Sequence, residues 1–298
     1  IIDEVKRNEI AFSIATNATL ATPQISKRLR DLDCAFVQAS LDGATAETHD
    51  TFRGTKCFER TVAGIRNLVA AGIQVGVATT VTKRNLREVP AIIDKAEELG
   101  AMLFMNYNFI PTGRGRALKH ADLTPAEREE LLTWMASEIG KRKLNLLSTA
   151  CQYSRICAGA GRLSLTHFDT FGQYDNLAKS AQFLAEFVGG CGTSRLYCAL
   201  EPNGDVEPCV FIPIVLGNIL RDDFLDLWHN HPVFKTIRKR ENFKGYCGVC
   251  EHRNICGGCR ARAYGYFGEL TESDPGCILN QQAWDSVRQE IKPLQLQA

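Results

Sequence analysis

Twelve cysteines are the residues of this 298-residue chain whose spacing could support chemistry. Eight of them fall between Cys191 and Cys277, and four of these stand in the pattern Cys247-x2-Cys250-x5-Cys256-x2-Cys259. Short C-x2-C loops let two sulfurs reach one metal, and glycines beside them let backbone N–H groups approach cluster sulfur. Eight thiols make two sets of four, as two [4Fe–4S] clusters or two zinc sites require. Spacing alone does not choose between these metals.

Disulfide bonding and chance burial account less well for these cysteines. A disulfide framework belongs to exported proteins, and the N-terminus IIDEVKRNEI lacks the layout of a signal peptide. Coincidental core cysteines do not explain the repeated two-residue spacing. The separate pair Cys151 and Cys157 is expected to be isolated buried thiols, with contact to a substrate as the alternative.

The dipeptide Asn203-Gly204 is a strong signal for a two-residue hairpin loop. If these two residues form the loop, Cys198 stands directly opposite Cys209. Directly opposed residues share one face of the ribbon, with Cβ atoms about 5 Å apart, so both thiolates could bind one metal centre. Pro202 weakens this interpretation because it lacks the N–H donor for the first rung.

The first 120 residues alternate short apolar runs with helical patterns. Four runs rich in Val, Ile, Phe and Thr predict strands over residues 10–17, 35–42, 74–81 and 102–110. Apolar residues at helical spacing, each run stopped by a glycine, predict helices over 57–71 and 85–99. Such alternation implies parallel strands joined by right-handed crossovers, and hence an α/β sheet or barrel.

Helical patterns also occur outside these units. The chain opens on a predicted helix over 1–8 that no strand precedes, and four β/α units are too few for a closed eight-stranded barrel. We therefore expect the N-terminal part of the α/β domain to be missing from this sequence. LTPAEREELLTWMASEIGKR, with Thr124 as its N-cap, predicts a helix, and another is expected near 222–240. Residues 121–190 are interpreted as a connecting segment, in which 177–188 is a candidate helix.

Bulk composition excludes several classes of protein. The 35 Lys and Arg against 34 Asp and Glu give a net charge of +1, which provides no overall attraction to nucleic acid or to an acidic membrane surface. The apolar fraction of 45% is too high for a disordered chain. No apolar stretch approaches the roughly 18 residues that span a bilayer. We expect a cytoplasmic protein that binds neither nucleic acid nor a membrane.

Taken together, the C-terminal cysteines resemble the SPASM domain, the auxiliary-cluster module at the C-terminus of many radical S-adenosylmethionine (SAM) enzymes. The resemblance rests on Cys191, Cys198, Gly204-x4-Cys209, the run from Cys247 to Cys259, and Cys277. Upstream, IATNATL resembles the third-strand motif of the radical SAM barrel, QASLDGATAETHDTFRG its fourth-strand segment, and NFIPTGRG the sixth-strand segment common in SPASM proteins. The chain departs from the family in having two residues rather than three between Cys256 and Cys259.

This resemblance implies a fold and two sets of cluster ligands. The fold is a partial (β/α)6 barrel of the radical SAM type over residues 1–120, lacking its first two β/α units, then the connecting segment, then a small SPASM domain over 191–298. The first auxiliary [4Fe–4S] cluster would be held by Cys191, Cys198, Cys209 and Cys259. The second would be held by Cys247, Cys250, Cys256 and Cys277.

The resemblance also implies a site for SAM. Thr16 and Asn17 could face its ribose, and Ser40 and Arg53 could bind its methionine carboxylate, Arg53 by a bidentate contact. The competing interpretation is that Ser40 and Asp42 cap the next turn and Arg53 is a solvated surface residue.

One family motif is absent. Radical SAM enzymes hold the cluster that cleaves SAM on a Cys-x3-Cys-x2-Cys loop, and that spacing occurs nowhere in this chain. A third [4Fe–4S] cluster is therefore expected in a missing N-terminal segment, and the chain by itself is expected to be inactive. In the intact protein, a 5′-deoxyadenosyl radical would abstract a substrate hydrogen, and the two auxiliary clusters would relay electrons.

Two functional classes stay open. The first is a radical SAM oxidoreductase that modifies a peptide or protein, or a small-molecule precursor such as a tetrapyrrole, with a low-potential donor such as ferredoxin or flavodoxin. The second is a non-catalytic iron–sulfur or zinc module that acts as a scaffold or electron carrier. No catalytic acid or base is assigned, because Val210 stands where relatives that mature sulfatases carry a carboxylate.

Overall fold

The computed structural model describes residues 1–161, 190–289 and 291, and these fall into two compact units. The first unit comprises Ile1–Asn108 and Met135–Thr149. The second comprises Phe109–Trp134 and the described residues from Ala150 onward. Among the described residues, no helix combines the length and the apolar character needed to cross a lipid bilayer.

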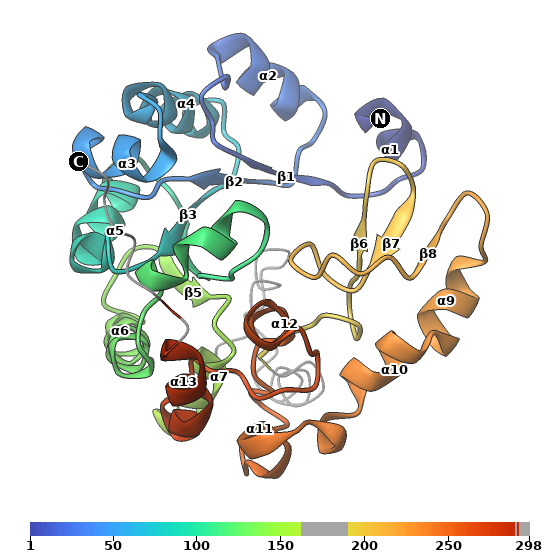
Figure 1. The fold of residues 1–298 in the computed structure, drawn as a ribbon. Helices are drawn as coiled ribbons and strands as arrows, with labels where there is room; N and C mark the ends of the chain where they lie inside the picture. The colour runs from blue at the N-terminus through green and yellow to red at the C-terminus, as the bar shows by residue number, and fades with distance from the viewer. Residues whose placement is uncertain (162–189, 290, 292–298) are drawn as a thin grey trace. The chain divides into compact units, whose positions relative to one another are not determined.

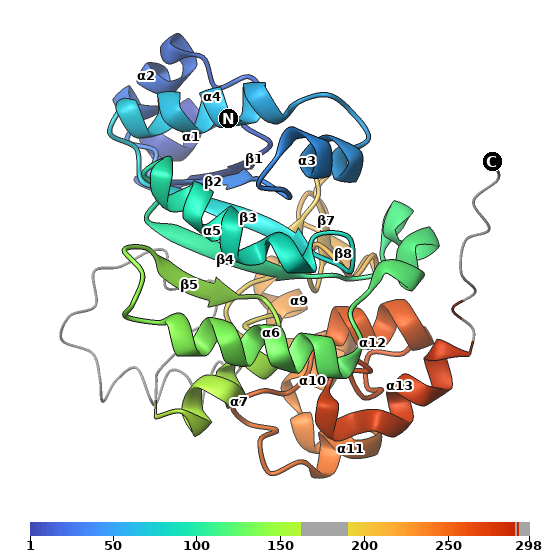
Figure 2. The same ribbon diagram turned by 90° about the vertical axis from the view of Figure 1, so that its left-hand side faces the viewer.

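A five-stranded parallel sheet forms the centre of the first unit (Figures 1 and 2). Its strands are neighbours in chain order: β1 (Ser13–Thr16), β2 (Phe36–Ser40), β3 (Val75–Val81), β4 (Leu103–Asn108) and β5 (Asn145–Ser148). The four predicted strands are confirmed as β1 to β4. The four-residue strand β5 was not predicted, so the strand count from the sequence was one short.

Both faces of β2 to β4 are buried, which is why these strands are continuous apolar runs. Phe36, Ala78 and Met105 pack together on one face. Val37 and Val77 alternate with them and are fully buried on the other face. Helix α4 (Phe58–Ala70) contacts β2 and β3, and α5 (Val89–Glu98) contacts β3 and β4.

Most helices of the first unit follow the predicted ranges. α1 (Ile2–Arg7) and α4 confirm two of them, and the predicted helix over 85–99 is a short 3-10 turn, η1 (Leu86–Glu88), followed by α5. Two short helices, α2 (Pro23–Asp31) and α3 (Ala46–Arg53), had no predicted range. Each begins at a threonine whose hydroxyl accepts a backbone hydrogen bond.

Helix α6 (Pro125–Glu138) begins as predicted. The Thr124 hydroxyl accepts a hydrogen bond from the Glu127 N–H, and the Glu127 carboxylate accepts one from the Thr124 N–H. This reciprocal pair is a capping box, which satisfies two backbone donors that the helix start leaves free.

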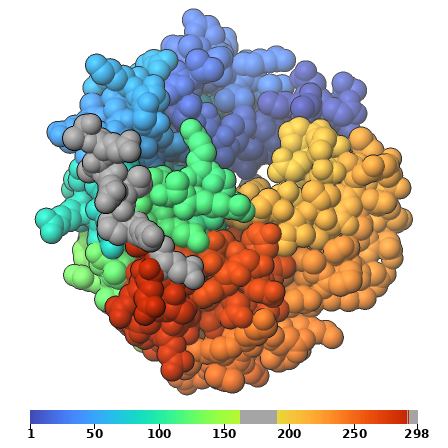
Figure 3. Space-filling model, viewed as in Figure 1, coloured from blue at the N-terminus to red at the C-terminus, as the bar shows by residue number. Residues whose placement is uncertain are grey.

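Apart from most of α6, the second unit is built from short elements, and its residues from 190 onward form the yellow, orange and red surface in Figure 3. Its three-stranded antiparallel sheet contains β6 (Ala199–Leu200), β7 (Asp205–Glu207) and β8 (Gly217–Asn218). Its helices are α7 (Gln152–Gly159), α9 (Phe224–Asn230), α10 (Pro232–Arg238), α11 (Gly245–Val249), α12 (Arg260–Phe267) and α13 (Gln281–Arg288). The 3-10 segments are η2 (Gly113–Ala121), η4 (Arg240–Asn242) and η5 (Ile278–Asn280).

The helix predicted near 222–240 is two helices, α9 and α10. His231 between them has an extended backbone with ψ of 131°, as expected for a residue that precedes a proline. The predicted domain boundaries near 120 and 190 stay predictions. The candidate helix over 177–188 lies outside the described residues.

Candidate cluster-binding site

Four of the predicted cluster ligands line one cavity in the second unit. Cys247, Cys250, Cys256 and Cys277 all contribute to its wall. Cys247 lies on α11, Cys250 directly follows that helix, and Cys277 precedes η5. Burial raises the pKa of the Cys256 and Cys277 thiols, so both keep their protons until a metal displaces them. Four thiols around one hollow are a donor set that fits a thiolate-ligated metal centre.

The loop between Cys256 and Cys259 requires both of its glycines. Gly257 and Gly258 have φ angles of +72° and +65°, a region that L side chains rarely adopt. A Cβ on Gly258 would also lie 3.0 Å from the Cys247 sulfur. The backbone of this loop therefore passes close to one of the thiols that line the cavity.

Three of the four thiols predicted for the first cluster gather at a second place. Cys209 and Cys259 belong to one buried cluster, and Cys191 packs against it. The Tyr197 hydroxyl lies 3.9 Å from the Cys191 sulfur and 3.8 Å from the Cys209 sulfur. This hydroxyl can donate a hydrogen bond to either sulfur once that sulfur is a thiolate.

The hairpin that carries Cys198 has a different register from the predicted one. β6 pairs with β7 through Ala199 opposite Glu207 and Leu200 opposite Val206. The loop therefore contains three residues, Pro202 to Gly204, and is closed by a hydrogen bond from the Glu201 N–H to the Asp205 carbonyl. The predicted two-residue loop was wrong because Pro202 has no N–H with which to form its first rung.

This register separates Cys198 from Cys209. Extending it by one residue places Cys198 opposite Pro208, and successive residues of a strand point to opposite faces. The prediction that Cys198 and Cys209 stand opposite each other was therefore wrong. Cys198 packs instead against a cluster formed by Val206, Leu216 and Phe234.

A thiol that the resemblance does not include lies with the first set. Cys151 is 1% exposed and belongs to the same buried cluster as Cys209 and Cys259. Its thiol hydrogen-bonds with Cys191 and Cys259, and these contacts, together with burial, raise its pKa. The sequence carries no signal for this placement, because Cys151 is forty residues before Cys191 and has no C-x2-C partner.

Asp274 connects the loops that carry the two sets of thiols. One of its carboxylate oxygens accepts hydrogen bonds from the Cys259 N–H and from the Gln152 side chain, both at 3.0 Å. Its own N–H lies 3.5 Å from the Cys247 sulfur. Burial opposes ionisation of Asp274, but Arg262 and the Cys259 N–H hold the pKa of this carboxyl below its usual value.

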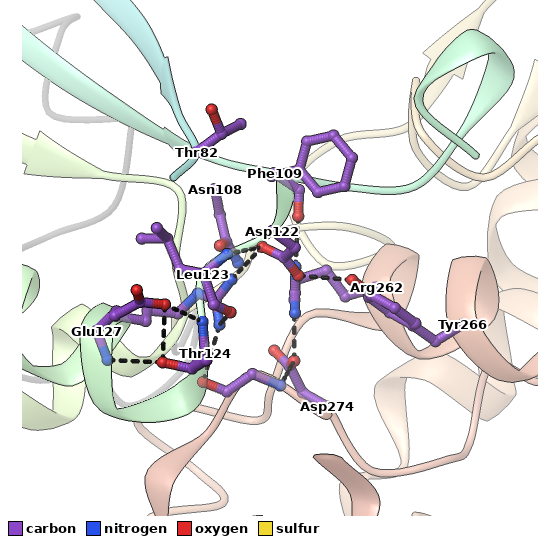
Figure 4. Close-up of polar contacts among 12 residues, drawn as sticks. Thr82, Asn108, Phe109, Asp122, Leu123, Thr124, Glu127, Arg262, Tyr266 and Asp274 are labelled. Carbon is purple, nitrogen blue, oxygen red and sulfur yellow. Dashed lines mark hydrogen bonds and ion pairs between the residues drawn. The ribbon is translucent and has the colours of Figure 1, made fainter. Parts of the chain in front are cut away.

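Further buried charges surround this carboxylate (Figure 4). Arg262 bridges Asp274 at 3.1 Å and Asp122 at 2.8 Å, and all three side chains are fully buried. Arg128 contacts the other oxygen of Asp122 at 2.6 Å, and the Tyr266 hydroxyl donates to Asp122 at 2.6 Å. Sequence analysis missed this network, because charged residues spaced so far apart along the chain carry no pattern that shows pairing.

The residues predicted to contact SAM lie in the first unit. Thr16 ends β1 and Ser40 ends β2, at the same carboxyl edge of the sheet. Because Thr16 pairs with Ala39, Thr16 and Ser40 point to opposite faces. The Thr16 hydroxyl accepts a hydrogen bond from the Ala18 N–H, and the Asn17 side-chain oxygen accepts one from the Thr19 N–H.

Arg53, on α3, forms an ion pair with a buried carboxylate. Its Nε lies 2.6 Å from an Asp42 oxygen, and the side chains of Arg53 and Asp42 are 31% and 1% exposed. The other Asp42 oxygen accepts a hydrogen bond from the Thr80 N–H at 2.8 Å. Arg53 is therefore held in place on one side and accessible on the other. Its contact with SAM stays a prediction, as do those of Thr16, Asn17 and Ser40.

Known proteins share these features. Residues 1–96 match the model of the radical SAM superfamily, and residues 191–260 match the iron-sulfur cluster-binding domain SPASM. The chain is 38% identical over 269 residues to the AdoMet-dependent heme synthase of Methanosarcina barkeri, which covers 89% of this chain and 73% of that protein. This chain belongs to the radical SAM family and carries a SPASM domain. The predicted family and fold class are confirmed, and the domain match favours iron–sulfur over zinc.

Other relatives of this radical SAM/SPASM chain differ in name. It is 31% identical over 286 residues to the mycofactocin maturase MftC of Mycobacterium tuberculosis, covering 93% of this chain and 66% of that protein. The crystal structure of Streptococcus suis SuiB bound to S-adenosylmethionine matches with a TM-score of 0.67 at 18% identity, over 93% of this chain and 61% of that one. The chain thus spans 61–73% of the length of these relatives.

Proposed function

We propose that the protein containing this chain is a radical SAM oxidoreductase that acts on a tetrapyrrole precursor of heme, with two auxiliary [4Fe–4S] clusters relaying electrons. The observation that carries this proposal is the 38% identity to an AdoMet-dependent heme synthase over 269 residues. A second heme synthase, from Nitratidesulfovibrio vulgaris, is 33% identical over the same length and supports the same substrate class.

The buried thiols support the auxiliary clusters. Each [4Fe–4S] cluster would replace the protons of four thiols and supply one-electron transfer when bound. The second would be held by Cys247, Cys250, Cys256 and Cys277. The first would be held by Cys191, Cys209 and Cys259, with Cys198 as fourth ligand by family order. Clusters with four cysteine ligands leave no open iron site for substrate, which favours electron relay as their role.

In the same proposal SAM binds at the carboxyl edge of the first unit's sheet, with Thr16, Asn17, Ser40 and Arg53 as its contacts. Asp42 would fix the Arg53 guanidinium through Nε, leaving the two terminal nitrogens for a bidentate contact with the methionine carboxylate. The cluster that cleaves SAM would lie on sequence outside this chain.

A peptide substrate is the second candidate, favoured by the 31% identity to a mycofactocin maturase. A non-catalytic iron–sulfur module is the third, since the chain carries no Cys-x3-Cys-x2-Cys loop. A ferredoxin or flavodoxin as electron donor and a cytoplasmic location are further parts of the proposal.

The test uses the full-length protein encoded by the reading frame that contains this chain. It is incubated anaerobically with SAM, a reductant and an iron porphyrin bearing carboxyethyl side chains, and 5′-deoxyadenosine and heme are measured by mass spectrometry. We expect both products. 5′-Deoxyadenosine with a precursor peptide but not with the porphyrin would favour the second candidate. Neither product, from a protein with intact clusters, would favour the third.

A further inference from the structure

The first auxiliary site lacks one sulfur if the family order holds. Cys191, Cys209 and Cys259 lie together, whereas Cys198 packs in a different cluster, around Val206, Leu216 and Phe234. The observed register of β6 with β7 does not place Cys198 opposite Cys209, and a one-residue slip of the hairpin would turn every side chain of β6 to its other face. Three thiols are one too few for a fully cysteine-ligated [4Fe–4S] cluster.

Cys151 lies where the missing sulfur is needed. It is 1% exposed, and its thiol hydrogen-bonds with both Cys191 and Cys259. Cys209 belongs to the same buried cluster, and so does Cys256, which also lines the cavity of the other thiol set. Four thiols from separate segments of the second unit therefore meet in one place.

Two backbone features fix Cys151 there. Gly190 packs directly against it, since a Cβ on Gly190 would lie 2.6 Å from the Cys151 carbonyl oxygen and 2.8 Å from its Cα. This close approach is open only to glycine and brings the next residue, Cys191, beside Cys151. On the other side, the Gln152 amide donates to Asp274, which also accepts from the Cys259 N–H.

We propose that Cys151, and not Cys198, is the fourth thiolate of the first auxiliary cluster, completing the set Cys151, Cys191, Cys209 and Cys259. The inference rests on the proposed function, because it takes the presence of two [4Fe–4S] clusters from there. The four sulfurs would hold the cluster as thiolates, and each one that is still a thiol would release its proton to solvent. Cys198 then stays a protonated thiol in the β-hairpin.

Two single variants separate the alternatives, and a third controls for damage to the core. Cys151→Ala and Cys198→Ala are compared with wild type and with Cys157→Ala, a fully buried cysteine further along on α7. Iron and sulfide are measured after anaerobic reconstitution, with electron paramagnetic resonance of the reduced proteins. We expect about eight iron and eight sulfide in wild type, Cys157→Ala and Cys198→Ala, and about half in Cys151→Ala, with the signal of one cluster lost.

A second measurement does not depend on how the variants fold. Native cluster-loaded wild type is alkylated with iodoacetamide, and the modified cysteines are identified by mass spectrometry. We expect Cys151 to be protected until the clusters are removed, and the half-buried Cys198 to react at the same rate with and without the clusters.

The opposite pattern would overturn the inference: Cys198→Ala losing one cluster while Cys151→Ala keeps both, or Cys198 protected from alkylation only while the clusters are bound. Equal loss in Cys151→Ala and Cys157→Ala would also overturn it, because packing alone would then explain the effect. A wild type that binds zinc and no sulfide would refute the proposed function instead, which keeps the two failures distinct.

Discussion

Asp274 contacts residues of both thiol sets. Its carboxylate accepts hydrogen bonds from the Cys259 N–H and from Gln152 and bridges to Arg262, while its backbone N–H approaches the Cys247 sulfur. A buried carboxylate with a buried arginine partner does not by itself imply high stability, because both charges have lost their water. Its value is positional: it determines where the loop containing Cys259 lies.

Asp274→Asn should therefore disturb both folding and cluster binding. The substitution removes one of the two carboxylates that pair with the buried Arg262 guanidinium, so that only Asp122 remains. The new amide group also lies against the N–H donors of Gln152 and Cys259. Breaking a buried ion pair costs about 3–5 kcal/mol. We expect the free energy of unfolding in urea to fall by about that amount and iron content to fall with it. Asp285→Asn removes a surface partner of Arg288 and is the control, expected to change stability by less than about 0.5 kcal/mol. Equal stability of the two variants would contradict the argument.

His49 gives the first unit a pH dependence. It is 1% exposed, its Nδ1 accepts a hydrogen bond from the Asp42 N–H, and its Nε2 lies 3.4 Å from the Cys57 sulfur. Burial and the nearby positive charge of Arg53 lower the pKa of His49 to about 4, with Asp50 acting in the opposite direction. Between about pH 6.5 and 4 the unfolded chain therefore binds a proton that the folded chain does not, and stability falls as the pH falls.

The loss should reach about 3 kcal/mol at the lower end of that window, and stability should level off above about pH 6.5. Urea unfolding of wild type and His49→Asn between pH 4.5 and 7.5 measures it. Asn offers an oxygen to the Asp42 N–H but takes up no proton, so its curve should be flatter. His229→Asn, at an exposed position on α9, is the matched control and should give a curve parallel to that of wild type. Parallel curves for wild type and His49→Asn would rule out this histidine as the cause.

At the scale of elements, length decided what the sequence could predict. Strands β2 to β4 and helices α4 and α5 are long enough to show their periods, and they were predicted within a few residues. β5 has only four residues, Asn145–Ser148, and its apolar pair Leu146 and Leu147 is too short to show a period. In the hairpin, the Asn203-Gly204 signal competed with Pro202, and the missing N–H of the proline decided the register.

The Cys256–Cys259 loop gives a prediction that separates backbone strain from crowding. Gly258 has φ of +65° and leaves only 3.0 Å between a would-be Cβ and the Cys247 sulfur, whereas Gly268, at the end of α12, has φ of +74° and nothing within 4 Å. Gly258→Ala and Gly268→Ala should both lose about 1–2 kcal/mol of stability to the left-handed backbone. Only Gly258→Ala should also lose iron, about half of it, because only its methyl group would crowd the sulfur of a predicted cluster ligand, Cys247. Full iron content in Gly258→Ala would show that the loop can shift.

For the molecule as a whole, the family could be predicted from the sequence, but the contacts between residues within the sites could not. Eight cysteines with two C-x2-C pairs, behind strand motifs in the family's order, were enough for the radical SAM/SPASM assignment. Cys151 and the pair Asp122–Arg262 were not predictable, because each meets its partners only through the tertiary fold. Contacts between residues so far apart in sequence carry no periodicity for a single sequence to reveal.

The two units should respond differently to loss of the clusters. The first has its own core, with fully buried Val37, Val77 and Phe104 in a parallel sheet. The second has strands of two or three residues, and its largest buried groups of side chains include Cys209, Cys256 and Cys259 themselves. Because its strands are so short and its core includes these thiols, we expect the second unit to gain folding free energy from bound metal, as small metal-stapled domains do.

Hydrogen–deuterium exchange before and after anaerobic removal of iron and sulfide tests this dependence. Peptides from residues 191–289 should lose protection, while those covering β2, β3 and β4 should keep theirs, because local stability follows local packing. Mock-treated protein taken through the same exchange of buffer is the control. Equal loss in both regions would mean that the sheet also relies on the clusters. Unchanged protection from exchange in residues 191–289 would mean that packing and buried ion pairs stabilise the second unit without metal. Its cysteines would then form sites that are already folded before the metal binds.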